Sequence, residues 1–301
     1  MSILVNWLES LHEEMKVTTK CSRVKNKKST TCRYCIEKCE HNAIELNGDV
    51  FIIDSKKCTL CGECMIACPL SAIEGVASKR NFEKGSLNFD NSFTPSLKEL
   101  LIYKKRGMTS IQISDQALNQ DWEKVLVETN IRLQLLNESP ITVSEKVKDE
   151  VLSRRAFFGS FQREGKQLAK SMAPVAWKME KDNWKLTKYF PNYQFYTVEI
   201  SQDQCTLCLA CFSHCGEDVF ELMDGKLLIK AERCVNCTSC RDVCPEKAIK
   251  IQQEIRRKSE QVIRVHSKTC KDCSHTFYTF DKETEKCHLC VIRDPDWLSP
   301  Y

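Results

Sequence analysis

The sequence CTLCLACFSHC occupies residues 205–215, and its cysteine pattern, C-x2-C-x2-C-x3-C, returns at residues 58–68 and 234–244. Residues 32–39 keep the ending C-x2-C-x3-C of a fourth copy, whose first cysteine is displaced upstream to Cys21. Closely spaced cysteines of this kind are a pattern of metal ligands. We therefore expect the fold to be built from four similar half-modules.

The four copies form two pairs with the same internal spacing. Cys39 precedes Cys58 by 19 positions, and Cys215 precedes Cys234 by 19 as well. Within each pair, apolar segments flank an Asn-Gly or Asp-Gly dipeptide, which predicts a β-hairpin. Each pair ends with proline and then Ala-Ile, which predicts an edge strand. A complete module has therefore been duplicated. The two predicted hairpins cover residues 43–53 and 219–229.

The chain contains 20 cysteines, which fall into three groups at residues 21–68, 205–244 and 270–290. The N-terminus lacks the features of a secretory signal and no apolar run is long enough to span a bilayer, so a cytoplasmic location is expected. Disulfides are rare in that reducing compartment. The grouping therefore predicts metal or redox chemistry rather than a disulfide scaffold.

Residues 21–76 and 198–252 resemble bacterial two-cluster ferredoxins, and their tandem resembles a polyferredoxin-type electron carrier. In that family the fourth cysteine of each run binds the neighbouring cluster. Clusters ligated by cysteine alone would pass single electrons and leave no coordination site for substrate. The resemblance implies four [4Fe–4S] clusters, held by Cys21, Cys32, Cys35 and Cys68; by Cys58, Cys61, Cys64 and Cys39; by Cys205, Cys208, Cys211 and Cys244; and by Cys234, Cys237, Cys240 and Cys215.

The displaced Cys21 departs from the family pattern, because a basic segment at residues 22–31 separates it from Cys32. Three interpretations stay open for this position: a complete cluster, a three-iron or labile cluster, and a plain surface thiol. A labile cluster would favour a different function, that of an iron–sulfur maturation or redox-sensing factor.

Two further cysteine pairs lie near the C-terminus, with 13 residues between them. Two C-x2-C knuckles at this spacing match a zinc ribbon with a structural ion. A rubredoxin-like iron site would use the same four thiolates and is the alternative. His275 and His288 flank the pairs and are interpreted as solvent-exposed residues rather than ligands. The predicted ligands are Cys270, Cys273, Cys287 and Cys290.

Residues 77–197 contain no cysteine and are predicted to form a separate middle domain, either α/β or helical. A Ser-x-x-Glu capping box starts a helix at Ser96 that ends before Gly107. A strand, a helix and a second strand then form a βαβ pattern without the glycine-rich loop of a nucleotide site. These three elements are expected at residues 109–113, 122–136 and 141–143.

Two more helices are expected outside this pattern. One starts at Ser144 and continues toward Trp184, where it is expected to lie across a ferredoxin module. Arg154 and Arg155 belong to its polar face in this interpretation, because a twin-arginine export signal would stand at the N-terminus. The other helix is expected at residues 4–15.

The sequence as a whole predicts an α+β fold with two ferredoxin-like (βαβ-βαβ) modules. The expected domains are an N-terminal helix at 1–20, ferredoxin-like modules at 21–76 and 198–252, a middle domain at 77–197 and a zinc-ribbon-like domain at 253–301.

The predicted function is that of a polyferredoxin-like subunit, which relays single electrons to or from a partner oxidoreductase without catalysis of its own. No dinucleotide-binding or P-loop signature is present to support another chemistry. The formal net charge is +4, but the thiolate-bound clusters and zinc would together lower it to about −6. We therefore expect a redox protein as partner, and neither nucleic acid nor a membrane.

Overall fold

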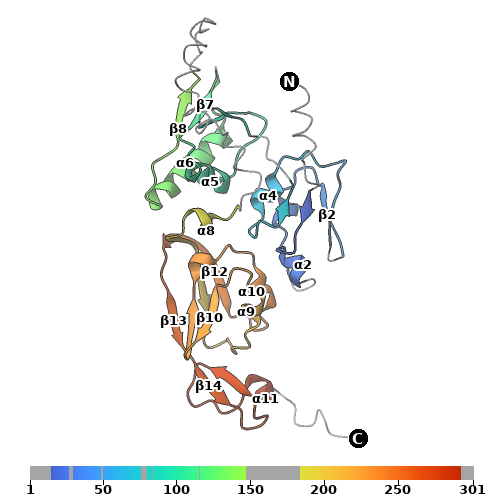
Figure 1. The fold of residues 1–301 in the computed structure, drawn as a ribbon, viewed down its shortest axis with the longest axis vertical. Coiled ribbons are helices and arrows are strands. Elements are labelled where there is room, and N and C mark those ends of the chain that lie inside the picture. The colour runs from blue at the N-terminus through green and yellow to red at the C-terminus, as the bar shows by residue number, and fades with distance from the viewer. Residues whose placement is uncertain are drawn as a thin grey trace, which may run out of the picture. The chain divides into compact units, whose positions relative to one another are not determined.

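The computed structural model describes residues 15–26, 30–48, 50–75, 80–83, 85–114, 116–146 and 184–292 (Figure 1). Two compact units are formed by these residues. The first unit contains residues 15–18 and 34–47 and the described residues from 51 to 189, and the second contains those from 19 to 33, 48, 50 and 190–292. The helix expected at 4–15 lies outside the described residues except for Met15, which is not helical. The helix start expected at Ser144 is wrong, because Ser144 and Glu145 belong to a strand, and the rest of that helix up to residue 183, including Arg154 and Arg155, lies outside the described residues. Among the described residues, no helix has the length and apolar character that crossing a membrane requires.

The first ferredoxin module contains the predicted hairpin and two short helices that carry cysteines of the pattern. Strand β2 (Ile44–Asn47) pairs with β3 (Val50–Ile53), which confirms the hairpin expected at residues 43–53. Helix α3 (Tyr34–Glu37) contains Cys35, and α4 (Glu63–Ala67) contains Cys64. Neither helix is long enough to be stable by itself, so both depend on packing against the module.

The edge strand expected after the proline is also present, and it has a partner that the sequence did not indicate. Strand β4 (Ile73–Glu74) pairs antiparallel with β1 (Lys16–Val17). The Thr18 N–H extends this pairing by donating to the Ala72 carbonyl at 2.8 Å. The helical segment expected at 1–20 therefore ends in a strand, because the β4 edge supplies backbone hydrogen-bond partners.

The cysteine-free part of the first unit is a four-stranded sheet with two helices. Figure 1 shows the two helices, α5 and α6, beside the strands β7 and β8 of this sheet. The strand order is β5-β6-β7-β8, with an antiparallel first pair and parallel second and third pairs. The βαβ prediction is thereby confirmed. The strands are β5 (Phe82–Glu83), β6 (Ser86–Asn88), β7 (Ser110–Ile113) and β8 (Thr142–Glu145), and the helices are α5 (Leu97–Lys105) and α6 (Gln120–Leu135).

Helix α5 begins with the predicted capping box and has an almost completely buried middle. The Glu99 N–H donates to Ser96 Oγ at 3.2 Å, and the Ser96 N–H donates to Glu99 Oε2 at 3.3 Å. The side chains from Leu100 to Tyr103 are fully buried. Capping and burial together fix α5 on the sheet.

The region around Trp184 contacts the first ferredoxin module. The Trp184 N–H donates to Ser71 Oγ at 2.9 Å, three residues after Cys68. The Trp184 ring lies edge-on to Tyr103 of α5, with 5.9 Å between ring centroids. Trp184 therefore contacts the first ferredoxin module as expected, but it is not part of the long helix that the sequence predicted. Helix α8 (Leu186–Tyr189) begins two residues later.

The second unit contains the second ferredoxin module, whose two sheets extend beyond the expected segment. Strands β9 and β12 pair antiparallel, and the predicted hairpin β10-β11 gains a third strand, β13. Strand β12 continues past residue 252, and β13 lies entirely beyond it. Part of the second module is therefore formed by the segment expected to be the zinc ribbon. The elements are β9 (Tyr193–Ile200), α9 (Ala210–His214), β10 (Phe220–Met223), β11 (Lys226–Ile229), the 3-10 turn η3 (Ala231–Arg233), α10 (Ser239–Val243), β12 (Ile249–Arg257) and β13 (Gln261–Arg264).

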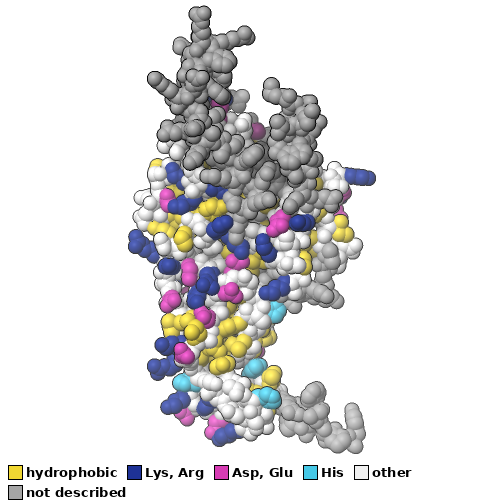
Figure 2. Space-filling model, in the orientation of Figure 1, with side chains coloured by type: hydrophobic (Ala, Val, Ile, Leu, Met, Phe, Trp, Pro, Cys, Tyr) yellow, Lys and Arg dark blue, Asp and Glu magenta, His cyan; other side chains and the backbone are white. Residues whose placement is uncertain are grey.

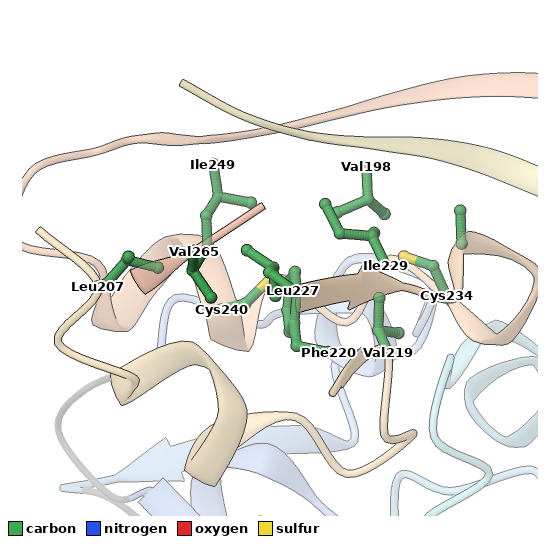
Figure 3. Close-up of a cluster of buried hydrophobic side chains, with 11 residues drawn as sticks. Val198, Leu207, Val219, Phe220, Leu227, Ile229, Cys234, Cys240, Ile249 and Val265 are labelled. Carbon is green, nitrogen blue, oxygen red and sulfur yellow. The ribbon is translucent and has the colours of Figure 1, made fainter. Parts of the chain in front are cut away.

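The core of this module includes two cysteines of the pattern. Cys234 is 6% exposed and Cys240 is 8% exposed, and both lie in one cluster with apolar side chains of the sheets (Figure 3). Leu227 and Ile229 of β11 are fully buried in the same cluster. The loops that carry these cysteines are therefore part of the hydrophobic core itself.

A small hairpin follows at the end of the described chain. Strand β14 (His266–Thr269) pairs with β15 (Thr276–Thr279), and α11 (His288–Ile292) lies after it. Cys270 and Cys287 are buried beside these elements.

A buried ion network connects the cysteine-free region to α4. Arg80 Nε donates to Glu99 Oε1 at 2.7 Å, and Arg80 Nη2 donates to Glu63, the first residue of α4. The side chains of Arg80 and Glu99 are 5% and 0% exposed. Tyr103 Oη also donates to Glu99 Oε1, at 2.6 Å. Each buried charge thus has an opposite charge or a hydrogen-bond donor beside it.

We predict that Arg80→Met destabilises the protein far more than the loss of a surface ion pair does. The substitution leaves the Glu99 carboxylate buried without its cation, which typically costs about 3–5 kcal/mol. Lys146→Met is the control, because Lys146 and Glu83 form a pair that is 43% and 38% exposed. Such a pair contributes at most about 1 kcal/mol. Anaerobic urea titration followed by circular dichroism would measure both, and equal losses would contradict the prediction.

Candidate metal centres

The three complete cysteine runs share an unusual backbone conformation. In each run, the second residue after the first cysteine and the residue after the second cysteine have positive φ. Most side chains avoid this left-handed region, and a residue held there costs about 1–3 kcal/mol. The two left-handed residues turn the chain twice within each run. As a result, the three cysteines of the run line one pocket. The positions are Leu60 and Gly62, Leu207 and Leu209, and Asn236 and Thr238.

The last cysteine of every half-module is followed by a second repeated turn. The third residue after it has positive φ, and the N–H of the fourth residue points back to the sulfur. A hydrogen bond of this kind favours the thiolate over the thiol. The residues with positive φ are Asn42, Ser71, Asp218 and Lys247. The bonds run from Ala43 N to Cys39 Sγ (3.3 Å), from Ala72 N to Cys68 Sγ (3.3 Å), from Val219 N to Cys215 Sγ (3.5 Å) and from Ala248 N to Cys244 Sγ (3.3 Å).

Three pockets in the structure are each lined by four cysteines, three from one run and one from the other half of the same module. One of these pockets lies in the first module and two lie in the second. Apolar residues make up most of the remaining lining. The cysteine groups are Cys39, Cys58, Cys61 and Cys64; Cys205, Cys208, Cys211 and Cys244; and Cys215, Cys234, Cys237 and Cys240.

The thiols in these pockets are difficult to ionise without a cation. Burial raises the pKa of Cys64 to about 12, and charges on Cys61, Cys58 and Cys39 add to the shift. Burial likewise raises the pKa of Cys211 to about 12. A metal cluster supplies the positive charge that converts such thiols to thiolates, so the donor set fits an iron–sulfur cluster.

The two cysteine groups of the second module lie next to each other. Burial raises the pKa of Cys240, and charges on Cys234, Cys237 and Cys215 of its own group contribute further. The charge on Cys211, from the other group, acts on the same thiol. Two redox centres in these pockets would therefore be neighbours.

The fourth predicted set is not brought together in one described unit. Cys21 and Cys32 belong to the second unit, whereas Cys35 and Cys68 belong to the first. Cys21 is 8% exposed and precedes α2 (Ser22–Asn26). Arg23 Nε donates to the Cys32 carbonyl at 2.7 Å, across the basic segment. This ligand set stays a prediction.

The four C-terminal cysteines form a much tighter group. Their sulfurs all lie within 4.8 Å of one another, and Cys273 Sγ is 3.8 Å from Cys287 Sγ. Sulfurs about 3.8 Å apart are expected around a tetrahedral ion with metal–sulfur bonds of about 2.3 Å. The group Cys270, Cys273, Cys287 and Cys290 therefore fits a single four-coordinate ion. His275 and His288 are not part of it.

Backbone N–H groups already favour the charged form of one of these thiols. Hydrogen bonds from Cys273 and Cys287 hold the pKa of Cys270 at about 6. The Cys287 N–H donates to Cys270 Sγ at 3.3 Å. A thiolate preformed in this way is the ligand that a zinc or iron ion binds.

Known proteins match the regions that contain these pockets. A family model described as a 4Fe-4S dicluster domain matches residues 29–73, and one described as a 4Fe-4S binding domain matches residues 227–250. An uncharacterized ferredoxin of Methanocaldococcus jannaschii is 32% identical over 59 residues, which are 19% of this chain and 95% of that protein. The chain belongs to the ferredoxin family. A ferredoxin of Methanothermococcus thermolithotrophicus is 35% identical over 60 residues, which are 19% of this chain and 100% of that protein.

The protein is thus an iron–sulfur electron-transfer protein with ferredoxin-like modules. Each ferredoxin relative has the length of about one module, so most of this chain has no counterpart in them. The dicluster match includes Cys32 to Cys68 and does not reach Cys21. The second match includes Cys234 to Cys244 and does not reach Cys205.

Sequence reasoning missed the residues that shape these ferredoxin loops. The turn after the last cysteine uses Asn, Ser, Asp and Lys at its left-handed position. Asn and Asp are enriched in this conformation, whereas Ser and Lys carry no such signal. What these residues share is their position, three residues after the last cysteine of the half-module. An alignment of the four half-modules with one another would have pointed to this position.

We predict that Lys247→Val weakens the cluster pocket of Cys244, whereas Lys247→Gly does not. Lys247 is exposed with a φ of 52°, and β-branched valine resists this conformation by about 1–2 kcal/mol. The valine variant should therefore lose the Ala248 N–H···Sγ bond and release iron faster. Both variants lose the same charge, so each controls for the other. Iron release to a ferrous chelator would measure the difference, and equal rates would refute the role of the turn.

Proposed function

We propose that the chain carries four [4Fe–4S] clusters and relays single electrons to or from a partner oxidoreductase. The proposal rests on the turn that follows the last cysteine of each half-module. In all four half-modules, a backbone N–H in this turn donates a hydrogen bond to the cysteine sulfur. Each cluster would supply reversible one-electron storage. The protein residues would hold the clusters, exclude water and place hydrogen bonds on the sulfurs.

The proposed ligand sets follow the cross-ligation of two-cluster ferredoxins. Three of them coincide with the cysteine groups that line the pockets. The fourth consists of Cys21, Cys32, Cys35 and Cys68. The repeated turn at Cys68, with its N–H···Sγ distance of 3.3 Å, supports the assignment of this cysteine as a ligand.

Electrons would enter or leave the second module at Cys208. This cysteine is exposed, unlike its partners Cys205, Cys211 and Cys244. Figure 2 shows hydrophobic side chains gathered over α9 and β10 of the same unit. A redox partner could dock transiently on this apolar surface, and the exposed Cys208 would then lie close to it.

The C-terminal cysteines would hold one zinc ion with a structural role. Thiolate ligands at tetrahedral spacing suit zinc, and a small hairpin with little core of its own needs a metal to fold. Iron in a rubredoxin-like site is the alternative. The glycine that usually follows a rubredoxin knuckle is replaced by Ser274 and Val291.

An iron–sulfur maturation or redox-sensing role is the second candidate, and one observation favours it. The residue after the second cysteine is left-handed in three half-modules, whereas Arg33 is not among the described residues with positive φ. A cluster on this irregular loop could be the labile one. Rapid transfer of that cluster to an apo-acceptor would distinguish the sensing role from the carrier role.

We predict about sixteen iron and sixteen sulfide per chain, and uptake of about four electrons in an anaerobic dithionite titration. Cys21→Ala should convert one cluster into a three-iron form with its own EPR signal and leave the others intact. Repeated reduction and oxidation should release no iron. Loss of one cluster in each cycle would shift support to the sensing role.

We predict that Cys290→Ser removes one metal ion from the protein and unfolds the C-terminal hairpin. Three remaining thiolates bind zinc more weakly, and the hairpin depends on the ion. His275→Ala is the matched control and should retain the ion, because His275 is exposed beside the site. Elemental analysis would give the metal content, and amide exchange would follow β14 and β15. Loss of the ion from His275→Ala would contradict the ligand assignment.

A further inference from the structure

A lysine from the cysteine-free region reaches the backbone between two cysteines of the first module. Lys98 Nζ donates to the Ile66 carbonyl at 2.5 Å and to the Cys68 carbonyl at 3.2 Å. Ile66 is 1% exposed and lies between Cys64 and Cys68, while the Lys98 side chain is half-buried. A cation is therefore fixed beside the turn that joins two proposed ligands.

The two carbonyl oxygens that accept hydrogen bonds from Lys98 Nζ favour its charged ammonium form. Burial lowers the pKa of Lys98 to about 8, and the charge of Cys68 acts in the opposite direction. Lys185 is the other charged group that acts on it, and its effect is also to lower the pKa. A negatively charged cluster would favour the ammonium form further.

In the duplicated second module, the residue that matches Ile66 in the sequence is an aspartate. Ile66 follows Cys64 by two residues, and Asp242 follows Cys240 by two. The Asp242 carboxylate accepts hydrogen bonds from Thr238 Oγ1 at 2.9 Å, from the Thr31 N–H at 2.9 Å and from Thr31 Oγ1 at 2.8 Å. Thr31 directly precedes Cys32, so the Asp242 carboxylate also lies beside a proposed ligand of the cluster that would take Cys68.

A fixed charge of either sign acts on the reduction potential of a cluster near it. Adding an electron makes a cluster more negative, so a nearby cation stabilises the reduced form. The surroundings of a cluster tune its potential when its ligands are unchanged. Lys98 provides this charge through space and through the Cys68 carbonyl.

We propose that Lys98 raises the reduction potential of the cluster that takes Cys68 as a ligand. The inference rests on the proposed function, because it requires a cluster on Cys68. In this role the cysteine-free region influences a cluster to which it contributes no ligand. Lys98 acts by holding one positive charge close to the Cys68 backbone. It biases the first module toward the reduced state.

The test is a redox titration of the full-length protein, monitored by EPR. Lys98→Met removes the charge and keeps the aliphatic stem, and Lys98→Arg retains the charge. Lys104→Met is the matched control, because Lys104 lies on the same helix and also donates to a carbonyl, that of Pro140, at 3.2 Å. We expect Lys98→Met to change one reduction equilibrium about tenfold, a fall of about 59 mV for one electron. Lys98→Arg and Lys104→Met should leave all potentials in place.

Other outcomes would overturn the proposal. Unchanged potentials in Lys98→Met, with its iron content intact, would show that the charge does not reach the cluster. An equal shift in Lys104→Met would show a general effect of surface charge, and loss of iron from Lys98→Met would show a purely structural role. Failure of the proposed function would look different. In that case Cys68→Ser would lose no iron from the otherwise unsubstituted protein.

Discussion

Burial of thiols is the physical constraint on which the ferredoxin modules depend. Cys64, Cys211 and Cys234 are held where burial raises the thiol pKa to about 12, so the free pocket strongly disfavours thiolates. Metal ligation reverses this, since the cation supplies the charge that water cannot supply there. The helices α4, α9 and α10 are only five residues long and cannot persist alone. Because Cys234 and Cys240 also belong to the hydrophobic core, cluster binding and folding of the module are expected to be coupled.

The repeated turns show that position matters more than residue type in this fold. Leu209, Thr238 and Gly62 occupy the same left-handed position after a second cysteine, although only glycine adopts it without strain. Leu209 and Thr238 are therefore strained. A cluster bound by the converging cysteines would offset this strain, because ligand–metal bonds would stabilise the loop conformation.

The sequence predicted those parts of the fold that local signals encode. The hairpins at β2-β3 and β10-β11 follow from their turn dipeptides, and α5 follows from its capping box. Strands β1, β9 and β13 were not predicted, because each is defined by pairing with a strand distant in sequence. The ligand sets of three pockets were accessible only through family resemblance, since spacing alone does not indicate which remote cysteine completes a group. Arg80 and Lys98 carried no sequence signal, because their roles depend on how α5 packs against α4.

Those two side chains bear on what the cysteine-free region does. Four clusters with the same all-cysteine ligation would have no built-in difference in potential, and a relay between equal centres has no preferred direction. Any bias must then come from residues other than the cysteines. Arg80 and Glu99 place a paired charge at the start of α4, and Lys98 places a cation at its end. The second module instead has the Asp242 carboxylate on α10. Residues other than the cysteines, such as Lys98 and Asp242, thus distinguish two modules that their cysteines make alike.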